Sequence, residues 1–271
     1  MTTHTPKIAV LGAGRIGEAL LGGLLRAGRA PADLLATERR PERIEELRAR
    51  YGIEITGTPE AAKAADILIL AVKPQDMAVL LEELAPHAAP GRLVISAAAG
   101  ITTAFVESRL AEGTPVVRVM PNTPVLVDEG MSVISPGRHA GEEHLAHAEA
   151  IFGSVGKTVR LPESQQDAAT ALSGSGPAYF YFLVEAMTDA GILLGLPRDQ
   201  AHDLIVQAAI GAAVMLRDSG EHPVKLREAV TSPAGTTISA IRELENHGVR
   251  AALIAALEAA RDRSRALAAG Q

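Results

Sequence analysis

The chain contains no cysteine, and this absence sets the first limits on its chemistry. Disulfide bonds, thiolate catalysis and cysteine-ligated zinc are excluded, and the composition fits a reducing compartment. The first seven residues, MTTHTPK, have no apolar stretch of the kind that a secretory signal requires, and they lead directly to the first predicted strand. We therefore expect a cytoplasmic protein.

The chain also lacks a basic block and an uninterrupted membrane-length apolar run. Its net charge of −6 argues against general nucleic-acid binding. Residues 178–196 approach the length of a membrane span, but Glu185 and Asp189 interrupt them one turn apart. A helix buried inside the protein or in a subunit interface is the better interpretation. We expect neither nucleic-acid nor membrane binding.

No Ser-His-Asp spacing, nucleophile elbow or close pair of acids stands out in the sequence. One group has the composition of a metal cluster, namely His139, His144 and His147 with Glu142 and Glu143. These side chains fall on an acidic predicted helix, and a solvated helix face is the ordinary explanation for them. We therefore predict no metal site.

What the chain does have is a glycine motif between a predicted strand and a predicted helix. The apolar run Ile8–Leu11 has no helical period, and a helix-permissive run follows at residues 18–25. Between them, glycines permit a tight turn, close approach of the backbone to a pyrophosphate, and close packing of helix on strand. The N–H groups of the helix start then face the phosphates. This motif predicts a nucleotide site, and the alternative is a glycine turn that only packs; the candidate residues are Gly12, Ala13, Gly14, Arg15, Ile16 and Gly17.

The choice of nucleotide depends on the end of the next predicted strand, residues 34–37. Glu38 follows about 20 residues after Gly17, at the position of a ribose-binding carboxylate, which by itself favours NAD. Arg39 and Arg40 come next, and guanidinium groups suit a 2′-phosphate. The alternative is a charged turn that leads into a solvated helix with Glu–Arg pairs. We expect NADPH to be preferred and NADH to be used to some extent.

The chain, with 271 residues of which 47% are hydrophobic, is long enough for two domains. In residues 1–160, strands at 34–37, 67–72, 93–96 and 116–120 alternate with helices, and 131–134 suits a further strand, parallel or antiparallel. This alternation predicts an α/β, Rossmann-like, doubly wound sheet. Residues 161–271 show only helical periodicity, so we predict a C-terminal all-helical domain with these helices: 167–172, 178–195, 198–218, 224–230, 237–247 and 249–267.

Several C-terminal helices are apolar around most of their circumference. A domain of about 110 residues cannot bury so much apolar surface by itself. We therefore predict a homodimer with interlocked helices.

Small and polar residues follow the carboxyl ends of the predicted strands. Besides Glu38, they comprise Lys73–Pro74, residues 96–100 and residues 121–124. Ligands of open α/β sheets bind at this edge, although each segment taken alone suits an ordinary turn. In the C-terminal half, residues 231–237 combine hydroxyls, a glycine and a new helix start, which suits a carboxylate ligand or a plain N-cap.

These residues together resemble one known family, the pyrroline-5-carboxylate reductases. The resemblance extends over nearly the whole chain and is most specific in the last of these segments: GAGRIGEA (12–19), AVKPQ (71–75), SAAAGI (96–101), RVMPNTP (118–124), SGSGPAYF (173–180) and LREAVTSPAGTTISAIRELE (226–245). Two positions depart from the family pattern. Ile16 stands where methionine is frequent, and Ala234 stands where glycine is common; a methyl group at the second position suggests a mild change.

The resemblance implies a Rossmann domain and a helical substrate-binding and dimerisation domain, with dimers often built into larger homo-oligomers. It implies reduction of 1-pyrroline-5-carboxylate to L-proline, the last step of proline biosynthesis, by hydride from NADPH or NADH. It assigns the substrate carboxylate to the signature loop, with Thr237 as the catalytic residue whose hydroxyl contacts the ring nitrogen. The implied substrate-binding residues are Ser232, Ala234, Gly235, Thr236 and Thr237. Those on the cofactor are Thr58, Ala71, Val72, Lys73, Pro74, Ala97 and Asn122.

A cyclic iminium is already electrophilic at carbon, so this reaction agrees with the lack of a catalytic dyad. The alternatives are another small two-domain imino-acid or hydroxy-acid dehydrogenase and a non-catalytic NADP-binding protein. The first generally carries a lysine or histidine on an early helix of its second domain, and residues 178–196 have neither. The second predicts a degraded substrate loop, whereas residues 232–237 retain the signature pattern.

Overall fold

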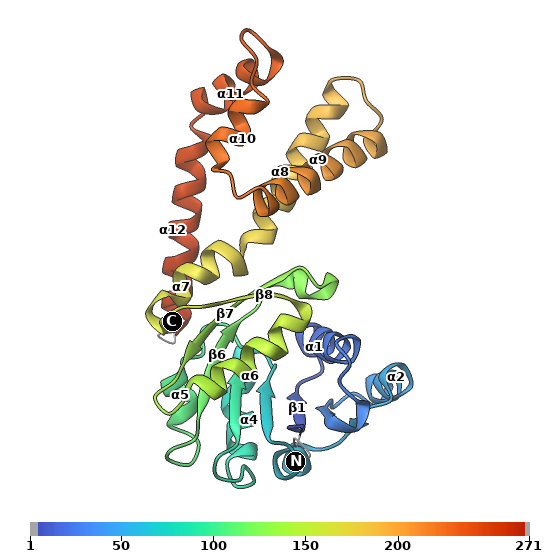
Figure 1. Ribbon diagram of the computed structural model, residues 1–271, viewed down its shortest axis with the longest axis vertical. Helices are drawn as coiled ribbons and strands as arrows, with labels where there is room; N and C mark the ends of the chain where they lie inside the picture. The colour runs from blue at the N-terminus through green and yellow to red at the C-terminus, as the bar shows by residue number, and fades with distance from the viewer. Residues whose placement is uncertain (1–4, 269–271) are drawn as a thin grey trace. The chain divides into compact units, whose positions relative to one another are not determined.

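The computed structural model of the protein describes residues 5–268. Eight strands form one sheet in the order β3-β2-β1-β4-β5-β6-β7-β8, and every neighbouring pair is parallel except β6 and β7 (Figure 1). The first six positions follow the usual strand order of a dinucleotide-binding sheet. Strands are added outward from β1 on one side, as β2 and β3, and then on the other side, from β4 onward. The strands are β1 Ile8–Leu11, β2 Leu34–Thr37, β3 Glu54–Ile55, β4 Ile67–Leu70, β5 Leu93–Ser96, β6 Val116–Met120, β7 Gly130–Pro136 and β8 Gly156–Arg160.

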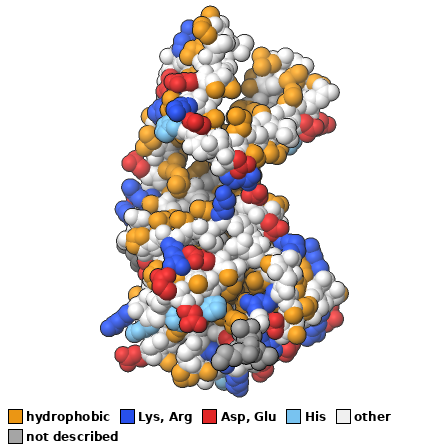
Figure 2. Space-filling model, viewed as in Figure 1, with side chains coloured by type: hydrophobic (Ala, Val, Ile, Leu, Met, Phe, Trp, Pro, Cys, Tyr) orange, Lys and Arg blue, Asp and Glu red, His pale blue; other side chains and the backbone are white. Residues whose placement is uncertain are grey.

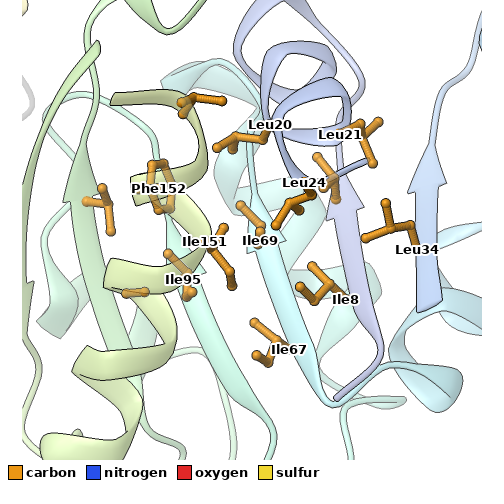
Figure 3. Close-up of a cluster of buried hydrophobic side chains, with 14 of the residues drawn as sticks. Ile8, Leu20, Leu21, Leu24, Leu34, Ile67, Ile69, Ile95, Ile151 and Phe152 are labelled. Atoms are coloured by element: carbon orange, nitrogen blue, oxygen red, sulfur yellow. The ribbon is translucent and has the colours of Figure 1, made fainter. Parts of the chain in front are cut away.

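Helices cover both faces of this sheet, which is why β1, β4 and β5 are buried along their whole length. On one face, α1 (Arg15–Arg26) and α6 (Glu142–Phe152) pack their apolar sides against the strands (Figure 3). Leu20 and Leu24 of α1 lie with Ile151 and Phe152 of α6 over these strands, and α2 (Pro41–Tyr51) adds the fully buried Leu47. Each fully buried side chain of this size contributes about 1.5–3 kcal/mol.

The opposite face carries α3 (Thr58–Ala64), α4 (Met77–Leu84) and α5 (Thr103–Glu107). Their buried side chains meet those strand residues that alternate with the first set, such as Leu11, Leu68 and Val94. Short helical turns join the other elements: η1 Pro31–Asp33, η2 Pro74–Asp76, η3 Thr123–Val127, η4 Gly153–Val155 and η5 Glu163–Gln165.

The chain divides into two compact units. The first comprises residues 1–175 and 260–271, and the second comprises residues 176–259, which form helices joined by turns. The remaining helices are α7 Gln166–Ala169, the π-helical turn η6 Thr170–Gly174, α8 Gly176–Leu193, α9 Arg198–Asp218, α10 Pro223–Ala229, α11 Thr236–Asn246 and α12 Val249–Ala268. Among residues 5–268, no helix is both long and apolar enough to cross a membrane.

The predicted fold class, an α/β Rossmann-like sheet followed by a helical region, is confirmed. Residues 131–134 belong to β7, which runs antiparallel to β6. Two elements were not predicted, namely α5 and β8. The second has no buried apolar run, because it forms an edge strand whose residues are half-buried or exposed. The predicted lead-in at residues 1–4 lies outside the described residues.

A buried ion pair fixes the chain where it leaves the sheet. Arg118 of β6, with a side chain only 4% exposed, donates to Glu163 Oε1 at 3.2 Å. Glu163 also accepts from the backbone N–H and the hydroxyl of Thr103, at 2.8 and 2.7 Å. This carboxylate therefore joins β6, α5 and η5, and it explains on structural grounds the arginine of the RVMPNTP segment.

Candidate functional site

The glycine loop after β1 owes its shape to two of its three glycines. Gly12 has a φ of +102°, and a Cβ there would lie 3.0 Å from the carbonyl oxygen of Ala71. A Cβ on Gly17 would lie 2.2 Å from the carbonyl oxygen of Gly12, a distance that backbone atoms cannot accept. A Cβ on Gly14 would meet no heavy atom of the described residues within 4 Å. Gly14 therefore leaves free space, whereas Gly12 and Gly17 allow close packing.

Hydrogen bonds fix this loop to the neighbouring strand. The N–H of Gly12 donates to the Thr37 hydroxyl, and the N–H of Ala13 donates to the Thr37 carbonyl, each at 3.0 Å. Helix α1 then begins at Arg15, preceded by Gly14, which has no side chain to cap the first turn. The N–H groups of that first turn remain available to an anion.

A cavity of about 560 Å³ lies against this loop, at the carboxyl ends of β1, β2 and β4. This is the crevice beside β1 and β4, where the strand order changes from one side of the sheet to the other. Open α/β sheets bind dinucleotides at this position. Predicted cofactor residues that line it are Gly12, Ala13, Gly14, Glu38, Arg39, Thr58, Ala71, Val72 and Lys73. The sheet thus brings together side chains from four separate segments of the sequence.

The other predicted cofactor residues lie elsewhere in the first unit. Arg15 begins α1 and is exposed, whereas Ile16 packs against the core and Gly17 is buried. Pro74 begins η2, and Ala97 follows β5, where its N–H donates to the Leu70 carbonyl. None of these residues lines the 560 Å³ cavity, and neither do Arg40 and Asn122.

Asn122 connects two segments of the first unit. Its amide nitrogen donates to the Ser173 carbonyl at 3.1 Å, and its amide oxygen accepts from the Met131 N–H at 2.8 Å. Both ends of the side chain are therefore used, so its placement has a structural explanation whether or not it also contacts a cofactor.

Several lining residues were missed by the sequence analysis: Thr37, Thr56, Gly57, Gln75, Asp76, Leu80 and Glu83. Thr56 and Gly57 follow the short strand β3, whose carboxyl end lies at the same edge of the sheet. Ligands of open α/β sheets bind at the carboxyl ends of strands, and the same expectation for β3 points to Thr56 and Gly57. Leu80 and Glu83 come from α4, and the sequence offers no periodic signal that assigns one side of this helix to a cavity.

Glu38 and Arg40 form the most constrained polar contact at the cavity. The Glu38 carboxylate, 9% exposed, accepts from the backbone N–H groups of Arg39 and Arg40 at 2.8 and 3.1 Å. The Arg40 guanidinium donates to both carboxylate oxygens, at 3.2 and 3.1 Å. These bonds lower the pKa of Glu38, and the bond from the Arg40 side chain has the largest effect. Arg39 points elsewhere, with its guanidinium 4.0 Å from Glu83.

In the second unit, residues 232–235 form the turn that precedes α11. The N–H of Gly235 donates to the Ser232 carbonyl at 3.1 Å, and a Cβ on Gly235 would lie 2.3 Å from the Ser232 hydroxyl. Gly235 precedes the first turn of α11, whose second residue is Thr237. The Thr237 hydroxyl has no hydrogen-bond partner among residues 5–268, so the loop presents an unused hydroxyl beside uncapped N–H groups.

Ala234 occupies the left-handed region with a φ of 57°, where glycine is the usual residue. The methyl group therefore carries backbone strain, which the residue pattern did not indicate. Left-handed backbone raises the energy of an L-residue by roughly 1–2 kcal/mol. Alanine in turn restricts the unfolded chain by about 0.4–1 kcal/mol relative to glycine. The two effects nearly cancel, and the strain is slightly larger.

We therefore expect Ala234→Gly to stabilise the protein by about 0.5 kcal/mol. Ala240→Gly is the matched control, because Ala240 is exposed within α11 and glycine there costs about 1 kcal/mol. The free energies of unfolding in urea would show the two changes with opposite signs. Equal losses of stability in both variants would show that Ala234 is not strained.

The candidate metal residues do not form a site. In the part of the chain from 5 to 268, no group of three or more His, Cys, Asp or Glu side chains is placed to hold a metal ion. Helix α6 instead uses its acids in ion pairs, with Arg160 contacting both Glu142 and Glu149 at 2.6 Å.

With this geometry in place, comparison with known proteins decides the family. The pyrroline-5-carboxylate reductase of Corynebacterium melassecola is 46% identical over 264 residues, which cover 96% of this chain and 98% of that protein. The chain belongs to the pyrroline-5-carboxylate reductase family. The resemblance inferred from the sequence segments is thereby confirmed.

Family models and solved structures agree with this membership. The model for pyrroline-5-carboxylate reductase dimerisation matches residues 163–267, and the model for NADP oxidoreductase, coenzyme F420-dependent, matches residues 7–100. A pyrroline-5-carboxylate reductase from Coxiella burnetii superposes with a TM-score of 0.93 at 35% identity, covering 97% of this chain and 99% of that one. The Plasmodium falciparum pyrroline carboxylate reductase, solved with NADP bound, has a TM-score of 0.87 at 28% identity, with coverages of 97% and 98%.

Proposed function

We propose that this member of the family reduces 1-pyrroline-5-carboxylate to L-proline with a reduced nicotinamide cofactor. The observation that carries the proposal is the cavity at the glycine loop. It has the place and the lining of a dinucleotide site, in a chain that matches reductases of this name from end to end. The cavity belongs to the first unit, residues 1–175 with 260–271, and the substrate loop belongs to the second, residues 176–259. The family model for dimerisation matches the whole of the second unit.

The residues at the cavity fit the cofactor. Gly14 leaves open space beside the first turn of α1, and the N–H groups of that turn suit a pyrophosphate. Glu38 and Arg39 line the part of the cavity that follows β2, where the adenosine ribose is held in sheets of this type. Thr58, Ala71, Val72 and Lys73 complete the proposed binding surface. The bound cofactor supplies the hydride.

We assign the substrate to the loop before α11. Backbone N–H groups of the segment Ser232 to Thr237, those at the uncapped start of α11, hold the substrate carboxylate. The Thr237 hydroxyl contacts the ring nitrogen, fixes the orientation of the ring and relays a proton. No stronger acid is required, because a cyclic iminium already accepts hydride at carbon. Helix α8 contains neither lysine nor histidine, so it offers no acid–base residue for a hydroxy-acid dehydrogenase.

NADPH is the preferred cofactor in this proposal, and NADH is used to some extent. Arg39 and Arg40 support the preference, since guanidinium groups suit a 2′-phosphate better than a hydroxyl. We place the reaction in the cytoplasm, because a protein without cysteine has no disulfide bond that a reducing environment would break.

The test is oxidation of NADPH and NADH, in parallel, by purified protein in the presence of pyrroline-5-carboxylate. We expect rapid oxidation that depends on the substrate and is faster with NADPH. The product is identified as proline by amino-acid analysis. Tight NADPH binding without oxidation would refute the assigned reaction and leave a different cyclic imine, or a cofactor sensor, as the function.

We also propose that residues 161–271 form a homodimer, within a larger homo-oligomer. In the second unit, large apolar side chains are widely exposed, including Leu193 at 89%, Leu194 at 83% and Phe182 at 69%. Figure 2 shows hydrophobic side chains on the surface of the molecule. Helix α9 has 21 residues, of which only Ala201 is buried. Apolar exposure on this scale marks an interaction surface. Light scattering on the purified protein should give a mass of at least two chains, each of 28.2 kDa, and a monomeric mass at micromolar concentration would refute the dimer.

A further inference from the structure

The cavity already holds one anion of its own, namely the Glu38 carboxylate. Its oxygens accept hydrogen bonds from the backbone N–H groups of Arg39 and Arg40. They also accept from Nε and Nη2 of the Arg40 guanidinium. These donors form a complete anion site: a turn of consecutive N–H groups next to a planar, two-pronged guanidinium. Glu83, another acidic residue that lines the cavity, lies on α4 and has its nearest arginine nitrogen, from Arg39, 4.0 Å away.

The two forms of the cofactor differ in what they require of this site. A ribose 2′-hydroxyl donates a hydrogen bond, so it can bind the Glu38 carboxylate without disturbing Arg40. A 2′-phosphate only accepts hydrogen bonds at neutral pH, so it needs the donors that Glu38 occupies, and it is repelled by the carboxylate. NADPH therefore has to displace Glu38 from Arg40, whereas NADH does not.

We propose that Glu38 is an internal competitor of the cofactor's 2′-phosphate, and that Arg40 exchanges Glu38 for the phosphate when NADPH binds. This exchange makes Glu38 the residue that limits NADPH preference and keeps the site open to NADH. The inference rests on the proposed function only for the class of cofactor, and it makes no use of the substrate or of turnover.

The test compares two nucleotide fragments, adenosine 2′,5′-bisphosphate and 5′-AMP, which differ only in the 2′-phosphate. Their dissociation constants are measured by calorimetry on the full-length wild type and on Glu38→Gln. Glutamine keeps the size of the side chain but removes the charge that competes for Arg40. We expect Glu38→Gln to raise the preference for the bisphosphate over AMP by about tenfold.

Glu42→Gln is the matched control. Glu42 lies in the first turn of α2, close to Arg40, but it is exposed and does not line the cavity. It loses the same charge, so a shift of similar size in both variants would reduce the effect to net charge and overturn the proposal. An unchanged or lower preference in Glu38→Gln would also overturn it.

Arg40→Gln provides an independent check in case Glu38→Gln binds neither fragment. Loss of the guanidinium should weaken the bisphosphate by about tenfold and change AMP affinity little. Equal weakening of both fragments would show that Arg40 does not receive the phosphate. Because no step uses pyrroline-5-carboxylate, a failed reductase assay leaves these results unaffected, and failure of the exchange leaves the reductase assignment intact.

Discussion

Substituting Gly17 by alanine is expected to abolish dinucleotide binding and to destabilise the first unit. The new Cβ would lie 2.2 Å from the carbonyl oxygen of Gly12 and 3.0 Å from a methyl carbon of Val10. Neither α1 nor β1 can move to relieve this, because Leu20 and Leu24 of the helix are packed into the core over the strand. We expect a loss of about 3 kcal/mol in stability, or roughly 5–10 °C in Tm, together with loss of NADPH affinity beyond about hundredfold.

Gly14→Ala separates packing from binding in the same loop. Its Cβ meets nothing within 4 Å among residues 5–268, and the φ of −72° suits alanine. We expect an unchanged Tm and an affinity for NADPH that is weaker by about tenfold or more, because the methyl group occupies space that the cofactor needs. Thermal melts and calorimetry with NADPH on both variants provide the comparison. Normal NADPH affinity in Gly14→Ala would show that the cofactor does not approach this loop.

The glycine loop was predictable because its glycines have separate physical causes: the backbone geometry requires Gly12 and Gly17, and Gly14 leaves space for a ligand. The same holds for β1, β4 and β5, whose apolar runs are buried on both faces of the sheet. The alternation of strands with helices likewise predicted a doubly wound sheet, although it did not specify the order of the strands. Because ligands of such sheets bind at the carboxyl ends of the strands, the sequence also predicted the edge at which the cavity opens and the presence of Glu38 and Lys73 there.

Other features depend on backbone geometry that no residue pattern encodes. The sequence ERR presents Glu38 and two arginines, and either arginine is an equal candidate for pairing with the carboxylate. The turn between β2 and α2 selects Arg40 and directs Arg39 toward Glu83. Ala234 likewise reads as a common small residue, and only its φ of 57° reveals the strain. Strand β8 is an edge strand, whose partly exposed pattern gives no run to detect.

The loop before α11, to which we assign the substrate, differs from an ordinary helix start in its capping residue. A plain N-cap would place a serine, threonine, aspartate or asparagine before α11, whereas the chain has Gly235 there. The helix start is thus left without a side-chain cap, at a position where a capping residue would stabilise the fold. A helix that forgoes its cap keeps the N–H groups of its first turn for an external carboxylate. Helices α3 and α6 also begin after a glycine, Gly57 and Gly141, so the missing cap permits ligand binding at α11 but does not by itself demonstrate it.

The second large effect is expected for Thr237→Ala, which should lower kcat by about hundredfold with little change in Tm. The hydroxyl has no partner among the described residues, so its removal leaves no protein group unsatisfied. What is lost is the orientation of the ring nitrogen and the proton relay, both of which matter most in the transition state. The fall should therefore appear in kcat more than in KM, in steady-state oxidation of NADPH with saturating pyrroline-5-carboxylate.

Two further variants decide whether the hydroxyl itself is responsible. Thr237→Ser retains the oxygen and should recover most of the rate, although its freer rotamer leaves it below wild type. Ser239→Ala removes a hydroxyl from the same turn of α11, but that hydroxyl donates to the Gly235 carbonyl at 3.1 Å and is already used within the helix. It should leave kcat nearly unchanged. A wild-type kcat in Thr237→Ala, or an equal fall of kcat in Ser239→Ala, would contradict the role of the Thr237 hydroxyl. The cofactor and the backbone N–H groups would then have to orient the ring, and the proton would have to come from another donor.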